Sequence, residues 1–243
     1  MRPLAANCRV RAFSLVEVIV AVTVVAILIA IALPALGRAR QASRDAASLA
    51  TVRQAVAGIG LYDAAERDAF PFFATPGDPF ATVMVDGAAV PGEFFMAQAK
   101  YWLFLVRPYV DGIETFRHPR DSHDDSPPLA RYWLTQTAFA DTEYWVGEFP
   151  PAGLSWFRGQ RTASVAFPSS KSMLVDISGG VFAANHAPGF TLLHGMCDGS
   201  AISFNGDSLA PEEACTVDRP FGAIHWRGLS TLGGLGGRDI VYR

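Results

Sequence analysis

One long apolar run dominates the hydropathy pattern of this chain. Residues 12–36 read AFSLVEVIVAVTVVAILIAIALPAL, interrupted only by Ser14, Glu17, Thr23 and one proline. A helix needs about 20 such residues to cross the hydrocarbon core of a bilayer, so the run predicts a membrane-spanning helix. A carboxylate inside such a segment costs about 2 to 3 kcal/mol unless a partner or the interface relieves it, which makes Glu17 a candidate functional residue.

Beyond this run, hydrophobic positions recur first at helical and then at strand spacing. Leu49, Val52, Val56 and Ile59 follow one another at steps of three and four, which predicts an amphipathic helix that packs on a sheet. A second, short helix is predicted over residues 93–107. Short β-prone runs between turn signals predict strands at residues 81–85, 163–167, 172–177, 180–183, 190–194, 201–204 and 239–242, with a further strand or hairpin arm within 131–149.

These elements predict an α+β fold, in which a long N-terminal helix packs on a C-terminal antiparallel β-sheet. The chain has 243 residues, half of them hydrophobic, which is enough for one membrane helix and one globular domain of about 180 to 200 residues. Its net charge is −3, and its lysines and arginines are scattered. We therefore expect no nucleic-acid partner, because nucleic-acid binding needs a basic surface.

Three interpretations compete for the N-terminus. A secretory signal peptide has an apolar segment of about 7 to 15 residues followed by a small-residue cleavage site, whereas this run is longer and no such site follows it. A plain membrane anchor fits the length, and Arg2, Arg9 and Arg11 orient the N-terminus to the cytoplasm, but this leaves Glu17 unexplained. The third interpretation is a leader peptide that is cut after Ala12, before the helix, so that the helix is retained.

The sequence FSLVE at residues 13–17 resembles the N-terminus of type IV pilins and type II secretion pseudopilins, whose precursors are cut ahead of an F-[ST]-L-[IV]-E sequence. The resemblance implies cleavage by a prepilin peptidase after Ala12 and methylation of the new N-terminal Phe13. It also implies that Glu17 neutralises the Phe13 amine of a neighbouring subunit, and that Pro34 kinks or locally melts the helix. Ala12 departs from the glycine that usually precedes the cut, but it is also small.

On this interpretation the chain has four parts: a leader peptide (1–12), a transmembrane and assembly helix (13–36), an amphipathic continuation of that helix (37–69) and a globular pilin-like head (70–243). The resemblance implies a single-pass protein of the cell inner membrane with its head in the periplasm or on an extracellular filament.

The function that the resemblance implies is that of a structural subunit of a type IV pilus-like or type II secretion pseudopilus filament. The expected partners are prepilin peptidase, the cytoplasmic membrane, copies of the same chain and other pilins or pseudopilins. The alternative is a minor subunit at the filament tip, whose aromatic-rich head recognises a ligand or a secreted substrate.

A second resemblance lies near the C-terminus. His186, Gly189, Asp198 and Gly199 stand as in the H…G…D-G signature of pilin-like proteins abundant in planctomycete-type bacteria, although the His-to-Asp interval is two residues longer. In physical terms, Asp198 and Gly199 predict a two-residue hairpin turn of the primed type between two strands.

We expect no enzyme. His186, His194, Asp176, Asp198 and Ser200 include the residue types of a nucleophile, a base and an orienting group. No nucleophile elbow, glycine-rich phosphate loop or paired-carboxylate motif surrounds them, and residue types alone are weak evidence for catalysis.

Cofactors are not expected either. The acidic loop that contains His118, Asp121 and His123 matches no metal-ligand spacing. Calcium at residues 198–207 is a better alternative, since some pseudopilins bind it near the C-terminus, but the ligand order there does not fit an EF-hand. Cys197 and Cys215 would remain after the leader is removed. In an oxidising compartment they are predicted to form a disulfide, with two free buried thiols as the alternative.

Overall fold

In the computed structural model of the protein, the described residues are 14–85, 87–92, 95–111, 116, 130, 132–146, 152–176, 191–205, 231 and 233–239. The chain divides into two compact units, residues 1–45 and residues 46–243. We call the second of these the head unit.

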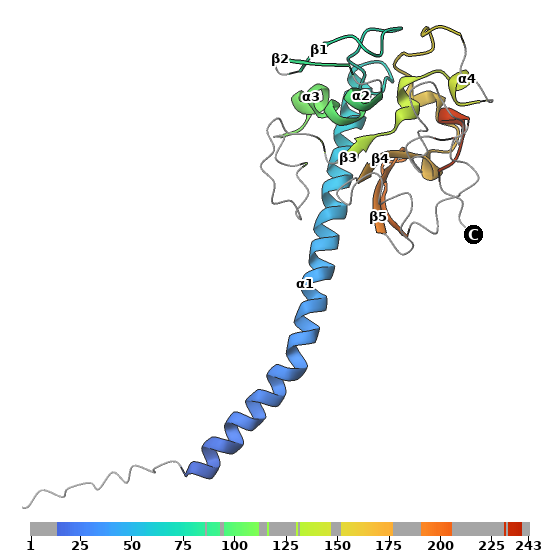
Figure 1. The fold of residues 1–243 in the computed structure, drawn as a ribbon. Coiled ribbons are helices and arrows are strands. Elements are labelled where there is room, and N and C mark those ends of the chain that lie inside the picture. The colour runs from blue at the N-terminus through green and yellow to red at the C-terminus, as the bar shows by residue number, and fades with distance from the viewer. Residues whose placement is uncertain are drawn as a thin grey trace, which may run out of the picture. The chain divides into compact units, whose positions relative to one another are not determined.

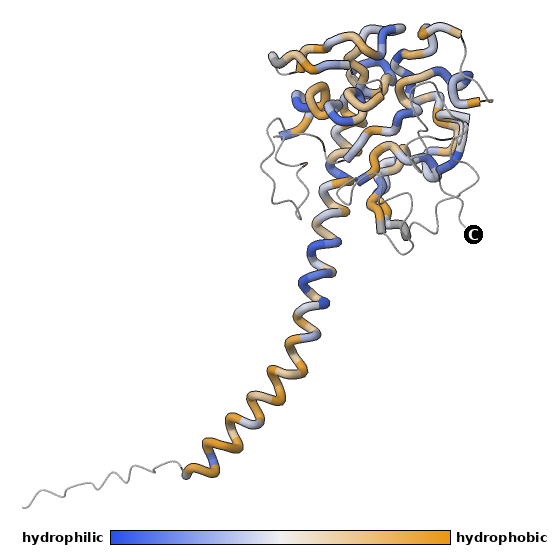
Figure 2. The backbone as a smooth tube through the Cα atoms, in the orientation of Figure 1, coloured by the Kyte–Doolittle hydropathy of each residue, from blue (hydrophilic) through white to orange (hydrophobic). Residues whose placement is uncertain are grey.

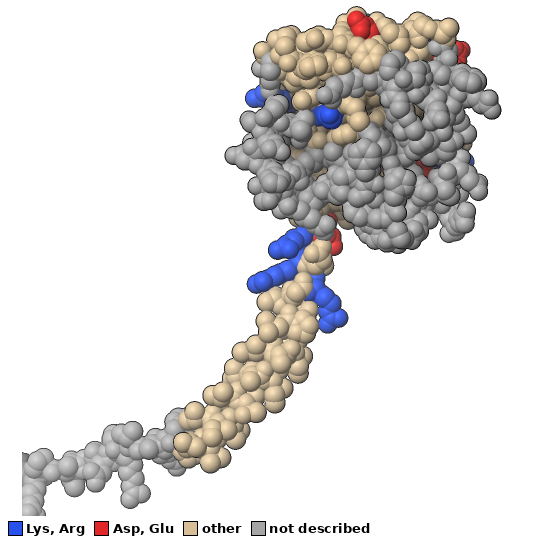
Figure 3. Space-filling model, viewed as in Figure 1, with Lys and Arg blue, Asp and Glu red and all other residues tan. Residues whose placement is uncertain are grey.

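Helix α1 (Leu15–Ala65) is the longest element of the chain (Figure 1). Every residue from Leu15 to Leu36 is exposed, and Figure 2 shows this part as a hydrophobic tube. The most apolar 18-residue window has a mean hydropathy of 3.0 and holds no buried position. Basic side chains follow this apolar part along the helix (Figure 3). Among the described elements, α1 alone is long and apolar enough to cross a membrane, as predicted.

Within the head unit, α1 carries the buried stripe that its spacing predicts. Val52, Val56 and Ile59 are buried, and Leu49 is partly buried. A Cβ atom added to Gly195 of strand β5 (Thr191–Met196) would lie only 2.3 Å from Val56 Cγ2. The absence of a side chain at Gly195 therefore lets the strand approach the helix closely, which confirms the predicted packing of the helix on a sheet.

That sheet has four antiparallel strands in the order β3-β4-β5-β6. The other three are β3 (Tyr132–Leu134), β4 (Ser172–Asp176) and β6 (Ala201–Asn205). Trp133 pairs with Val175, which pairs with His194 on the other side, and His194 pairs with Ile202. All five residues of β4 are buried, as a strand between two neighbours and a packed helix requires. Strands β1 (Val83–Val85) and β2 (Ala88–Val90) form a separate hairpin. The α+β fold is therefore confirmed.

Short helices complete the described head unit. The predicted helix over 93–107 is divided into α2 (Phe95–Tyr101) and α3 (Leu103–Val106) at Trp102, whose Nε1 donates a hydrogen bond to Tyr132 O at 2.8 Å. The remaining helical elements are α4 (Thr142–Trp145) and the 3₁₀ turns η1 (Arg107–Tyr109), η3 (Gln136–Phe139), η4 (Thr162–Ser164), η5 (Pro168–Ser170) and η7 (Gly234–Gly236).

Two strand predictions differ from the structure. The arm within 131–149 is a strand only in β3, and η3 and α4 follow it. The strand at 163–167 is wrong, because η4 (Thr162–Ser164) covers its first two residues and Val165 N donates to Thr162 O in a local turn. The strand at 180–183 lies outside the described residues, and at 239–242 only Asp239 is described, in a bend.

Aromatic side chains form the centre of the head unit. The Phe95 ring stacks on Trp145 with centroids 5.5 Å apart and meets Tyr144 edge-on at 5.4 Å. Tyr144 in turn packs against Trp156 at 4.1 Å. All four side chains are buried, so these aromatic residues stabilise the core and are not available as a ligand-binding surface.

Candidate functional site

The first turn of α1 contains the described part of the predicted processing and assembly site. Ala12 and Phe13 lie outside the described residues. Ser14 N and Ser14 Oγ donate hydrogen bonds to Glu17 Oε2 at 2.9 and 3.0 Å, and Glu17 N donates to Ser14 Oγ at 3.3 Å. This reciprocal arrangement is a capping box, in which two side chains satisfy backbone donors at the start of a helix.

The capping box gives Glu17 a partner within its own chain, which the sequence analysis missed. The pattern S-x-x-E at residues 14–17 is the signal that could have revealed it. Both side chains are exposed, and in the described part of the chain only Oε2 of Glu17 accepts hydrogen bonds. The capping box therefore engages one oxygen of the Glu17 carboxylate.

Pro34 lies inside α1, and the residues on both sides of it are helical. A proline within a helix removes one backbone hydrogen bond, which membrane helices tolerate. The helix is not melted at this position in the structure. A role for Pro34 in assembly stays a prediction.

The second predicted motif lies in the turn between β5 and β6. Gly199 N donates to Met196 O at 3.1 Å, and Met196 N donates to Ser200 O at 2.8 Å. The loop therefore has three residues, with Cys197 and Asp198 at its centre and Gly199 in the left-handed region at φ +90°. The predicted two-residue primed turn is wrong. Such a turn requires a positive φ at Asp198, and the described non-glycine residues with a positive φ are Arg67 and Asp68.

Asp198 stabilises this turn with its own side chain. Its Oδ1 accepts hydrogen bonds from Ser200 N at 2.9 Å and from Ser200 Oγ at 2.7 Å. The two residues of the motif that are described, Asp198 and Gly199, thus have a clear role in folding. The other two, His186 and Gly189, lie outside the described residues.

A cavity of ≈ 310 Å³ opens beside this turn. Its lining includes Val56 and Ile59 of α1, Met173 of β4, and Cys197 and Gly199 of the turn. Burial raises the pKa of the Cys197 thiol to about 12, so the sulfur is protonated and a poor nucleophile at neutral pH. Cys197 is a free thiol in the structure, and its predicted partner Cys215 lies outside the described residues. Their disulfide stays a prediction.

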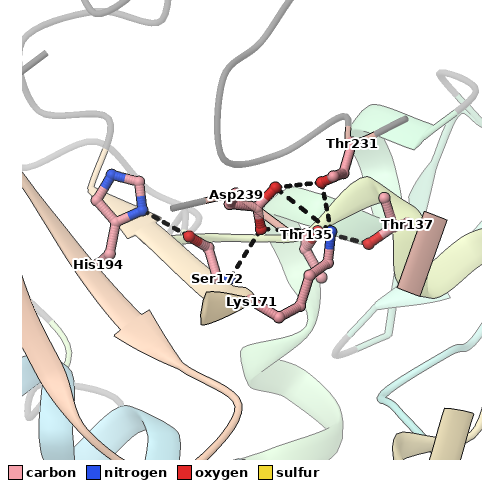
Figure 4. A network of polar contacts seen from close by, with 7 residues as sticks. All are labelled: Thr135, Thr137, Lys171, Ser172, His194, Thr231 and Asp239. Atoms are coloured by element: carbon pink, nitrogen blue, oxygen red, sulfur yellow. Dashed lines mark hydrogen bonds and ion pairs between the residues drawn. The ribbon is translucent and has the colours of Figure 1, made fainter. Parts of the chain in front are cut away.

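A buried polar network lies at the start of β4 (Figure 4). Lys171 and Asp239 are both buried, and Lys171 Nζ lies 3.3 Å from Asp239 Oδ2. The Thr231 hydroxyl hydrogen-bonds to both of these side chains. Ser172 N donates to Asp239 Oδ2 at 2.8 Å. The network therefore ties residues near the C-terminus to the central sheet.

His194 lies in the same region and is fully buried. Its Nδ1 is 2.8 Å from Ser172 Oγ (Figure 4). Burial lowers the pKa of His194 to about 4, against the smaller opposing effects of Asp239 and Asp176. The imidazole is therefore neutral at neutral pH and is buried on strand β5.

The four candidate catalytic residues that the structure describes do not form one arrangement, and the fifth, His186, lies outside the described residues. His194 and Asp176 are buried in the sheet, whereas Asp198 and Ser200 are exposed and bond to each other. Among the described residues, no group of three His, Cys, Asp or Glu side chains could hold a metal ion. The acidic loop at 117–129 and the end of the candidate calcium segment, residues 206 and 207, lie outside the described residues.

Comparison with known proteins adds one finding. Residues 7–33 match the family model of the prokaryotic N-terminal methylation motif. Together with the long apolar helix that starts at Leu15, this match fits a type IV pilin-like protein anchored by a single membrane helix. No curated protein and no solved structure matches the chain.

Proposed function

We propose that this chain is a structural subunit of a type IV pilus-like or type II secretion pseudopilus filament. Prepilin peptidase removes residues 1–12, and Phe13 is methylated on its new amine. The observation that carries this proposal is the methylation motif at residues 7–33, which overlaps the start of a helix whose residues from Leu15 to Leu36 are all exposed.

An exposed apolar helix needs an apolar environment, because contact of so many Val, Ile and Leu side chains with water is unfavourable. The lipid bilayer provides that environment before assembly, and the corresponding helices of neighbouring subunits provide it in the filament. On this proposal α1 anchors the chain as a single-pass protein of the cytoplasmic membrane, with the head unit in the periplasm or on the filament surface. Arg2, Arg9 and Arg11 then lie on the cytoplasmic side.

Glu17 and Phe13 provide the proposed contact between subunits. Cleavage after Ala12 creates an ammonium group on Phe13, and the Glu17 carboxylate of the adjacent subunit neutralises it. Both charges lie at the start of an apolar helix, where water is scarce and an uncompensated charge is costly. The capping box is compatible with this role, since its hydrogen bonds to the carboxylate are made through Oε2.

The test is isolation of filaments from cells that produce the full-length protein with an epitope tag on the head unit. We expect sheared filaments to carry the tag along their whole length in immunogold images. Cells without prepilin peptidase are the control, and in them the uncut precursor stays in the membrane. Absence of the protein from every filament fraction would contradict the proposal, and label at the tip alone would favour the minor-subunit alternative.

A further inference from the structure

Three arginines follow the apolar part of α1 at once: Arg38, Arg40 and Arg44. All three are exposed, and Figure 3 shows their region as a basic band on the helix. The sequence has no Asp or Glu between Glu17 and Asp45. Asp45 itself accepts a hydrogen bond from Gln41 Nε2 at 2.8 Å. We call the three arginines the arginine collar.

The collar occupies two opposite sides of the helix. Each residue turns an α-helix by about 100°, so Arg40 lies about 200° and Arg44 about 240° from Arg38 around the axis. A protein partner with an acidic surface would cover one side of the helix and leave Arg38 or Arg40 outside the contact. A layer of lipid headgroups encloses a membrane helix on every side, and it matches a charge distribution of this kind.

The height of the collar also fits a headgroup layer. With a rise of about 1.5 Å per residue, Arg38 lies about 3 Å and Arg44 about 12 Å beyond Leu36, where the apolar run ends. Helical side chains point toward the helix N-terminus, which here is toward the bilayer, and arginine is long enough to reach back to the headgroups.

We propose that the arginine collar binds the anionic headgroups of phospholipids on the Arg38 side of the membrane, an inference that rests on the membrane insertion proposed above. This contact sets the depth at which α1 sits in the bilayer. It gives the subunit a preference for an anionic phospholipid over a zwitterionic one, since each basic residue close to an anionic surface gains electrostatic attraction.

The experiment uses the full-length protein in lipid nanodiscs of phosphatidylcholine and phosphatidylglycerol. A fluorescent amino acid replaces Gly37, where an added Cβ meets no atom within 4 Å. Quenching by chain-brominated phosphatidylglycerol is compared with quenching by chain-brominated phosphatidylcholine, and the ratio measures which lipid lies beside the collar. We expect phosphatidylglycerol to be preferred about five- to tenfold in low salt, and less in high salt.

Two variants separate the collar from general charge. The double variant Arg38→Gln/Arg40→Gln should lower the preference to about one- to twofold. Arg53→Gln removes the same kind of charge from an exposed position further along α1 and should leave the preference unchanged. An equal loss of lipid preference in Arg53→Gln would overturn the proposed lipid binding by the collar and leave the proposed membrane insertion standing. A wild-type protein that is inserted but shows no lipid preference would have the same consequence. A protein that alkaline carbonate extracts from membranes would overturn both the collar and the proposed membrane-inserted subunit.

Discussion

Ser14 and Glu17 close the first turn of α1 by reciprocal hydrogen bonds, the shortest of which joins Ser14 N to Glu17 Oε2 at 2.9 Å. Glu17 therefore has a structural role in the single chain and a proposed role between chains. The two roles need different chemistry, because a cap needs only a hydrogen-bond acceptor, whereas pairing with the Phe13 amine needs a negative charge.

The first prediction separates these roles. Glu17→Gln keeps an oxygen acceptor for the cap and removes the charge, so we expect a loss of filament yield of tenfold or more, on the order of 1.4 kcal/mol per subunit contact. Ser14→Ala removes the cap at a cost of about 1 kcal/mol and keeps the charge, so filaments should still form. Quantitative blots of sheared filaments measure both, with cleavage of the precursor as the control for membrane insertion. A normal filament yield in Glu17→Gln would show that Glu17 acts only as a cap and would contradict its role between subunits.

The second prediction compares two glycines on the same helix. A Cβ on Gly58 would lie 2.7 Å from Val110 Cγ1, whereas a Cβ on Gly60 meets no atom within 4 Å. Gly58→Ala should therefore destabilise the head unit by about 1 to 2 kcal/mol through overpacking. Gly60→Ala should stabilise it by about 0.5 to 1 kcal/mol, since alanine favours a helix. Denaturant unfolding of the full-length protein in detergent, followed by near-UV circular dichroism, measures both, and a stable Gly58→Ala variant would refute this packing of α1.

The third prediction concerns the buried pair of Lys171 and Asp239. Lys171→Met leaves the Asp239 carboxylate buried without its cation and should cost about 3 to 5 kcal/mol of unfolding free energy. The double variant Lys171→Met/Asp239→Asn removes both charges and keeps an acceptor for Ser172 N, so it should recover at least half of that loss. The control is the ion pair of Arg158 and Asp141, 2.6 Å apart. The Arg158 side chain is 59% exposed, so Arg158→Met should cost less than about 1 kcal/mol.

Some of this architecture follows from local sequence pattern. The spacing of Val52, Val56 and Ile59 identifies the buried face of α1 because helical periodicity is a property of one segment. Strands β4, β5 and β6 are found for a similar reason, since turn-forming residues separate short β-prone runs. The Asp198-Gly199 pair locates the last turn, but its type depends on the pairing of Met196 with Ser200, which sequence alone does not determine.

Other features depend on contacts between distant residues. Lys171 and Asp239 are 68 positions apart, and nothing near either residue signals that it is buried with the other. The strand expected at 163–167 contains suitable residues, yet Thr162 starts a 3₁₀ turn, and Phe167 packs under the Arg238 guanidinium at 3.9 Å. The capping box, in contrast, is local, and its pattern S-x-x-E at residues 14–17 also fits a Glu17 that pairs between subunits.

The fourth prediction follows from the buried imidazole of His194. Its pKa is about 4 in the folded protein and about 6.5 in the unfolded chain, so the unfolded state binds the proton more readily. The stability that the neutral imidazole contributes is present above pH 6.5 and is lost as the pH falls toward 4, by about 3 kcal/mol in all. His194→Gln should remove this part of the pH dependence while the carboxylates titrate as before. Unfolding free energies at pH 7.5, 5.5 and 4.5 measure the difference, and identical pH profiles for the two proteins would contradict a buried neutral His194.

The most direct test of the central claim is intact-mass and N-terminal peptide mass spectrometry of the protein purified from its own membranes. Our account predicts a mature chain that begins at Phe13, carries one methyl group on its α-amine and lacks residues 1–12. A chain that still begins at Met1, or one cut beyond Leu36 so that the apolar helix is lost, would contradict it.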